Sequence, residues 1–254
     1  MQMSKAKMEN RALPKRFYAA ADVAACEGDF AITLDGKNVR TPQQKLLRTN
    51  SKKLVQQIAE EWNAQAEVID TDTMPLTRLL NIALDRVEAD RSALLADIAG
   101  YLETDLLCYR APLQNDALPI DSPNEQLRAL QVQHFDPILD WVKRDYAAAF
   151  ITTDGLMPVP QPQASIEKMA SLFAAANDQE LAALAMLVPL LGSALLTLAL
   201  WQGFVDVEAA LTAARLDESV QAEAWGEDTE VAHKWAAKCR DIRACAVFLD
   251  CARP

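Results

Sequence analysis

The stretch FAITLDGKNVRTP (residues 30–42) combines a short apolar run with a turn signal. Asp35-Gly36 accepts the positive φ angles of a tight hairpin turn, so the flanking residues are expected to form antiparallel strands. Pro42 cannot donate a ladder hydrogen bond, which favours the edge of a sheet or an exit from it. Working outward from this hairpin, we expect four short strands, at residues 16–20, 30–34, 39–41 and 46–49.

After Asn50 the apolar period becomes helical. Ser51 is a suitable N-cap, and the stripe that begins at Leu54 continues to Trp62. Further helices are expected at residues 76–87 and 91–109. From Ser122 onward the chain is expected to be helical, with an extended loop at Pro158, Pro160 and Pro162. The predicted fold class is therefore α+β. A small mixed α/β N-terminal domain with a short antiparallel sheet covers residues 1–88, and an all-helical domain covers residues 89–254.

Residues 181–204 carry no charged side chain and are long enough to cross a bilayer. Pro189, Gly192 and Gly203 interrupt the run, and both flanks are acidic, with no positive cluster to set an orientation. We therefore expect a helical segment buried in the second domain, without membrane insertion. A membrane-associated factor stays as an alternative, which clean partition into the soluble fraction would remove.

The net charge of −11 is unevenly distributed. Residues 1–53 carry eleven Lys and Arg against five Asp and Glu, whereas the rest carries fourteen against thirty-one. An acidic body repels phosphate backbones, so no nucleic-acid partner is expected.

The five cysteines are an odd number and contain no C-x-x-C pair. Cys239, Cys245 and Cys251 are six residues apart, about 240° on a helix, and cannot converge on one metal ion. Free thiols in a reducing compartment are expected. No secretory signal opens the chain, which agrees with a reducing compartment; the family resemblance described below narrows the expected location to the cytoplasm of a bacterium, or the mitochondrial matrix in a eukaryote.

The sequence shows no machinery for common enzyme chemistry. Its seven glycines are scattered singly, without a nucleotide-binding pattern, and His134 and His233 have no partner at metal-ligand spacing. We therefore expect no metal, no cofactor and no catalytic residue. A protein that holds another protein is favoured over an enzyme.

The strongest candidate for a catalytic cluster consists of Asp105, Tyr109 and Arg110. Asp105 and Tyr109 would share one face of the predicted helix at residues 91–109. We favour a structural anchor that fixes this helix end against the N-terminal domain through a charge-assisted hydrogen bond. The alternative is an enzyme that uses these three residues on a small molecule.

A second dense segment surrounds Trp225 with carboxylates, among them Glu218, Glu223, Glu227 and Asp228. Gly226 can close one helix and Thr229 can cap the next. Spacing alone favours a helix junction with solvated acids. The functional alternative is a recognition surface, with Trp225 as the anchor and the carboxylates selecting a basic partner.

Several motifs, in this order, give the chain a resemblance to a known family: Arg16-Phe17-Tyr18, residues 34–42, Ile58-Ala-Glu-Glu-Trp62, Met74-Pro-Leu-Thr77, Thr104-Asp-Leu-Leu-Cys-Tyr-Arg110, Asp136-Pro137 with Trp141, and Trp225-Gly226. The order resembles the assembly chaperones for the alpha subunit of the F-type ATP synthase catalytic head. One departure is His134, where that family usually has Trp.

The resemblance implies the α+β fold, transient binding of the unassembled alpha subunit without ATP hydrolysis, and prevention of its aggregation. It also implies a functionally sensitive glutamate near Trp225, for which Glu218 and Glu223 are the nearest candidates. Glu218, Glu223, Trp225, Glu227 and Asp228 are accordingly expected to bind the partner. The chain itself is expected to be a monomer.

Overall fold

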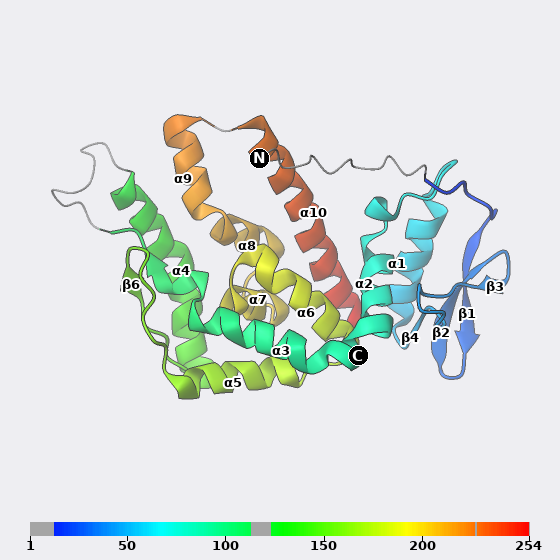
Figure 1. Ribbon diagram of the computed structural model, residues 1–254, viewed down its shortest axis with the longest axis horizontal. Coiled ribbons are helices and arrows are strands. Elements are labelled where there is room, and N and C mark those ends of the chain that lie inside the picture. Colours follow the sequence, from blue (N-terminus) through cyan, green and yellow to red (C-terminus); the bar gives the residue numbers. More distant parts are fainter. Residues whose placement is uncertain (1–12, 113–122, 227, 254) are drawn as a thin grey trace, which may run out of the picture.

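The computed structural model describes residues 13–112, 123–226 and 228–253. A small sheet lies at one end of the long axis, and helices make up the rest of the molecule (Figure 1). The strands of this sheet belong to the N-terminal part of the chain and the helices follow them. This arrangement confirms the predicted α+β class.

The sheet is built around its second strand. β1 (Ala21–Cys26) pairs antiparallel with β2 (Asp29–Leu34), and β3 (Lys37–Asn38) and β4 (Arg48–Thr49) both pair antiparallel with β2. The last four residues of β2 are buried, as expected of a strand with neighbours on both sides.

The hairpin turn lies where the sequence predicted it. Asp35 has φ 47° and Gly36 has φ 77°, the two positive values that a primed two-residue turn requires. The β2–β3 hairpin that results from this turn places Thr33 opposite Asn38.

The prediction of a strand at residues 16–20 is wrong, because the first strand begins five residues later. The carboxylate of Asp35 accepts hydrogen bonds from the backbone N–H groups of Ala19 and Ala20, and Arg16 donates to the carbonyl of Tyr18. Side chains therefore satisfy backbone groups that a neighbouring strand would have paired. The expected strand at residues 39–41 is likewise reduced to a single bridge between Arg40 and Leu46.

Ser51 caps the first helix as predicted, because its Oγ accepts a hydrogen bond from the N–H of Leu54. Three helical segments follow: α1 (Lys52–Asn63), α2 (Pro75–Ile82) and α3 (Glu88–Glu103). A π-helical turn at Ala83–Val87 joins α2 to α3, so the chain runs helically through the predicted domain boundary at residue 88.

The predicted helix at residues 91–109 extends too far. α3 ends at Glu103, Leu106–Cys108 form a 3₁₀ turn, and Tyr109–Arg110 form the short strand β5. Asp105 therefore precedes a 3₁₀ turn and does not share a helix face with Tyr109. The helix ends here because the Asp105 carboxylate accepts the N–H of Leu107, as an N-cap does.

Beyond residue 123 the chain consists of helices joined by loops, and the longest described loop, residues 147–162, contains β6 (Thr153–Asp154), which pairs in parallel with β5. Within the described residues, the two short strands β5 and β6 depart from the all-helical expectation for residues 89–254. Five of the helices in this part of the chain are α4 (Asn124–Tyr146), α5 (Gln163–Ala174), α8 (Val207–Ala214), α9 (Leu216–Trp225) and α10 (Thr229–Ala252).

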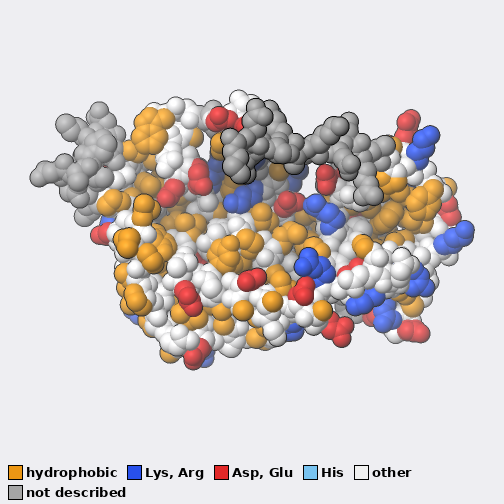
Figure 2. Space-filling view, viewed as in Figure 1, with side chains coloured by type: hydrophobic (Ala, Val, Ile, Leu, Met, Phe, Trp, Pro, Cys, Tyr) orange, Lys and Arg blue, Asp and Glu red, His pale blue; other side chains and the backbone are white. Residues whose placement is uncertain are grey.

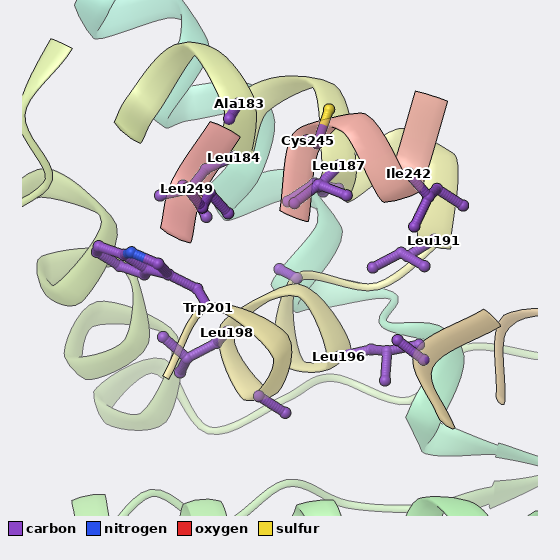
Figure 3. Close-up of a cluster of buried hydrophobic side chains, with 14 of the residues drawn as sticks. Ala183, Leu184, Leu187, Leu191, Leu196, Leu198, Trp201, Ile242, Cys245 and Leu249 are labelled. Atoms are coloured by element: carbon purple, nitrogen blue, oxygen red, sulfur yellow. The ribbon is translucent and has the colours of Figure 1, made fainter. Parts of the chain in front are cut away.

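The apolar block forms two helices, α6 (Asp178–Leu191) and α7 (Ala194–Trp201). Gly192, at φ 69°, ends α6, and Ser193 caps α7. Figure 3 shows α6 and α10 facing each other across the core, with Leu184, Leu187 and Leu191 on α6 and Ile242, Cys245 and Leu249 on α10. In the part of the chain that the structure describes, no helix has the length and hydropathy needed to cross a membrane.

One contiguous cluster of buried side chains extends from Ile32 in the sheet to Ala252 at the end of α10. α10 packs against α1 and α2 as well as against α6 and α8. The C-terminal helix therefore joins the two predicted domains. A division at residue 88 stays a prediction.

Candidate protein-binding surface

The candidate surface lies where α9 ends and α10 begins (Figure 1). Gly226, at φ 87°, ends α9 directly after Trp225. The expected cap of the next helix was Thr229, but the cap is Asp228, whose Oδ1 accepts the N–H of Glu230 at 2.6 Å. An aspartate one residue earlier can accept this orphan N–H, and Thr229 becomes the first helical residue.

Trp225 is 71% exposed, which is unusual because tryptophan has the largest side chain of all residues and is highly buried on average. Glu218 lies seven residues before it, so both side chains lie on the same face of α9, two turns apart. Both residues are exposed. This pair gives the surface an indole and, two turns away on the same face, a carboxylate.

Glu223 lies on a different face of α9 and contacts α4. Its Oε2 accepts a hydrogen bond from Gln126 Nε2 at 3.4 Å, although the residue is exposed. Of the predicted surface residues, Glu227 lies outside the described part of the chain. Asp228 is exposed too, but its carboxylate is committed to the cap of α10.

The buried side chain of Gln131 fixes α9 against α4. Its Nε2 donates to Asp217 Oδ1 at 3.0 Å, while its Oε1 accepts the N–H of Ala111 at 2.7 Å. Gln131 is only 3% exposed, so both bonds are shielded from water. The helix α9, which carries the acidic residues, is therefore fixed against α4.

The second predicted group, around Asp105, lies inside the molecule. Asp105 is fully buried and accepts hydrogen bonds from Ser193 Oγ at 2.6 Å and from the N–H of Leu195 at 3.0 Å. These partners lie at the start of α7. The predicted anchor pointed to the N-terminal domain, whereas these bonds join the end of α3 to another helix of the second half.

Arg110 pairs with a carboxylate that lies outside the predicted cluster. It forms an ion pair with Asp136 of α4 and donates to the carbonyl of Leu107 at 2.7 Å. Its guanidinium also lies 5.3 Å from the centre of the Phe135 ring. Tyr109, half-buried, pairs with Thr153 in the short parallel sheet. The three residues therefore do not converge on one site.

Burial raises the pKa of Asp105 from 3.8 to about 6, against the lowering effect of its hydrogen bonds with Ser193 and the backbone. A raised carboxyl pKa is often a sign of catalysis. Here the carboxylate is not reachable by a substrate, because it is 0% exposed. Among the described residues, no group of three His, Cys, Asp or Glu side chains could hold a metal ion.

Phe17 belongs to the motif Arg16-Phe17-Tyr18 but was not among the predicted binding residues, and it is 74% exposed at the sheet end of the molecule. Phe17 and Tyr18 are two adjacent aromatic residues between Arg16 and a run of alanines. The sequence feature that could have pointed to this site is the pair of adjacent aromatic residues just before the first strand. In the structure one of the two side chains is buried and the other is exposed.

Comparison with known proteins gives concordant results. The family described as ATP12 chaperone protein matches residues 15–143. The crystal structure of Atp12 from Paracoccus denitrificans is 37% identical, with a TM-score of 0.85 over 94% of this chain and 99% of that one. A solved protein from Agrobacterium tumefaciens is 40% identical, with a TM-score of 0.86 over 95% of this chain and 87% of that one. The mitochondrial protein atp12 of Schizosaccharomyces pombe is 22% identical over 228 residues, 87% of this chain and 76% of the relative.

An α+β fold with a small sheet, a helical body and this set of relatives defines a class, the assembly chaperones. Within that class, the chain belongs to the ATP12 chaperone family. This confirms the resemblance to ATP synthase assembly chaperones that the ordered motifs suggested.

Proposed function

We propose that this protein binds the unassembled alpha subunit of F-type ATP synthase and prevents its aggregation until the catalytic head assembles. The membership of the ATP12 chaperone family carries this proposal. An unassembled subunit exposes apolar surface that normally meets its neighbours, and such surface drives aggregation. A holder must cover that surface and remain displaceable, which fits an interface of ordinary size, roughly 1,600 Å² in total.

The surface at the end of α9 supports binding to a protein. Trp225 supplies a large exposed anchor, and Glu218 and Glu223 supply negative charge that can select a basic region of the partner. Gln131 and Asp217 hold this helix in place, so little ordering is required when a partner binds.

The proposal is tested with purified, isolated alpha subunit at an aggregating temperature, followed by light scattering. We expect a stoichiometric amount of this protein to suppress scattering and to form a complex in size-exclusion chromatography. No suppression and no complex would refute it. Sedimentation of the protein alone is expected to show a monomer.

Within this proposal, Glu223→Lys is expected to weaken binding by about tenfold, because it places a positive charge where a basic partner would lie. The lost hydrogen bond to Gln126 is exposed and long, so the melting temperature should change little. Glu88→Lys on α3, also an exposed glutamate, is the matched control. Equal affinities for Glu223→Lys and the wild type in a titration would contradict the role of this surface.

The location follows from the same proposal. A bacterial member would act in the cytoplasm, and a eukaryotic one in the mitochondrial matrix, where the alpha subunit is assembled. Fractionation of cells that express the tagged full chain, with detection in the soluble fraction, tests this and also the membrane-associated alternative.

A further inference from the structure

A pocket at the sheet end of the molecule brings together three segments that are far apart in the sequence. It has a volume of about 370 Å³ and is lined by residues 17–18, 34–35 and 37–40 and by Trp62. Tyr18 and Leu34 belong to a small buried cluster, against which Val39 and Trp62 pack. The floor of the pocket is therefore apolar and part of the folded core of this end.

Phe17 stands at the rim of the pocket with 74% of its side chain exposed. Its ring contacts Tyr18 edge-to-face at 5.5 Å. The backbone around it is fixed on both sides. The N–H of Arg16 donates to the carbonyl of Glu67, and the N–H of Ala19 donates to the Asp35 carboxylate. The exposed ring is consequently held in place in advance, which lowers the entropy lost when it binds another surface.

Two of the three charged side chains that line the pocket are positive. Lys37 and Arg40 are both exposed and line it, and in the described part of the chain neither lies in an ion pair. Asp35 is the one carboxylate in the lining, and its oxygens accept the N–H groups of Ala19 and Ala20. Figure 2 shows hydrophobic side chains gathered over this end, with Lys, Arg and some acidic side chains around them.

We infer that this pocket is a second contact site for the client, and that it receives an apolar or aromatic side chain flanked by carboxylates. The inference rests on the proposed function. Phe17 supplies the anchor and the pocket floor the apolar contact, while Lys37 and Arg40 select an acidic segment. The sheet end and the acidic end of α9 lie at opposite ends of the long axis (Figure 1). Opposite charges at two separated contacts fix the orientation of the client on the chaperone.

The test compares the binding of purified alpha subunit to the full-length wild type, to Phe17→Ala and to the double variant Lys37→Glu/Arg40→Glu. The control is Lys143→Glu/Lys168→Glu, which makes the same change of charge on exposed residues of α4 and α5. We expect the dissociation constant to rise about tenfold for Phe17→Ala, the size typical of an aromatic anchor. A similar rise is expected for the double variant at low salt, with a smaller rise in 0.5 M salt. The control should bind as the wild type does.

The outcomes separate the two proposals. If the wild type does not bind the alpha subunit, the proposed function fails and this inference fails with it. If the wild type binds and both pocket variants bind equally well, the inference alone is overturned. A wild-type dimer that Phe17→Ala dissociates would assign the pocket to a second copy of the chain and would also overturn it. Circular dichroism and melting curves of each variant check that the fold is retained.

Discussion

At the scale of single residues, the most informative side chain is Asp105. Most buried carboxylates sit beside a cation, but the described contacts of Asp105 are neutral donors, namely Ser193 and backbone N–H groups. Because neutral donors offset only part of the cost of burial, the carboxyl keeps a raised pKa while still joining the end of α3 to the start of α7.

Asp105→Ala is expected to destabilise the protein by about 3 kcal/mol at pH 7, because buried N–H and O–H donors lose their acceptor. Urea unfolding followed by circular dichroism measures this free energy. Asp97→Ala, an exposed residue of α3, is the control and should change stability by less than about 0.5 kcal/mol. A change of that small size for Asp105→Ala would contradict the anchoring role.

The same carboxyl makes stability depend on pH. Its pKa is about 6 in the folded protein against 3.8 for an ordinary aspartate, so the folded state binds more protons between these values. Stability therefore falls as pH rises through this window, by about 3 kcal/mol in full from this group. The destabilisation by Asp105→Ala is accordingly expected to be about 2 kcal/mol larger at pH 4.5 than at pH 7.5. Equal values at both pH values would show that the pKa is not raised.

At the scale of elements, helix starts connect parts of the chain that are distant in sequence. The carboxylate of Glu61 in α1 accepts the N–H groups of Leu76 and Thr77 at the start of α2, at 2.7 and 2.8 Å. Burial raises the pKa of Glu61 against these hydrogen bonds. This contact gives the two motifs a structural role: Ile58–Trp62 supplies the hydrogen-bond acceptor, and Met74–Thr77 supplies the N–H donors.

Ser51 makes a similar connection between the first and last helices. Its Oγ caps α1 and also donates to the carbonyl of Cys251 near the end of α10. Ser51→Ala is expected to lower the free energy of unfolding by about 1–2 kcal/mol, through loss of the cap and of the contact with α10. Thermal or urea unfolding measures the change. Ser92→Ala, at an exposed position of α3, should be neutral or slightly stabilising because alanine is the better helix former.

At the scale of the whole molecule, the core does not divide at residue 88. Arg78 of α2 contacts Asp241 of α10, and Lys53 of α1 contacts Asp250, so the sheet end depends on the last helix for its packing. The buried cluster from Ile32 to Ala252 continues across the same boundary. When the predicted N-terminal domain is separated from the rest, it therefore loses the helix α10 that packs against α1 and α2.

A fragment of residues 1–88 is consequently expected not to fold alone, and the full chain is expected to unfold in one cooperative transition. Circular dichroism and one-dimensional NMR of the fragment test the first expectation, and coincident tryptophan fluorescence and circular dichroism transitions test the second. A folded fragment with dispersed amide signals, or two separate transitions, would support the division into domains instead.

The sequence by itself determined the features that depend on neighbouring residues. The Asp35-Gly36 turn, the Ser51 cap and the end of α9 at Gly226 all lie where local chemistry predicted them. These features need only backbone conformation and hydrogen bonds within a few residues, which the residue types specify directly.

Only the tertiary structure decided the rest. The first strand begins later than predicted because Asp35, fifteen residues away, takes the N–H of Ala20. The end of α3 is joined to the start of α7 because Ser193, eighty-eight residues away, donates a buried hydrogen bond to Asp105. The pocket beside Phe17 likewise exists only where three separate segments meet. Contacts between distant residues form when the chain packs, and one sequence read residue by residue does not contain the distances between them.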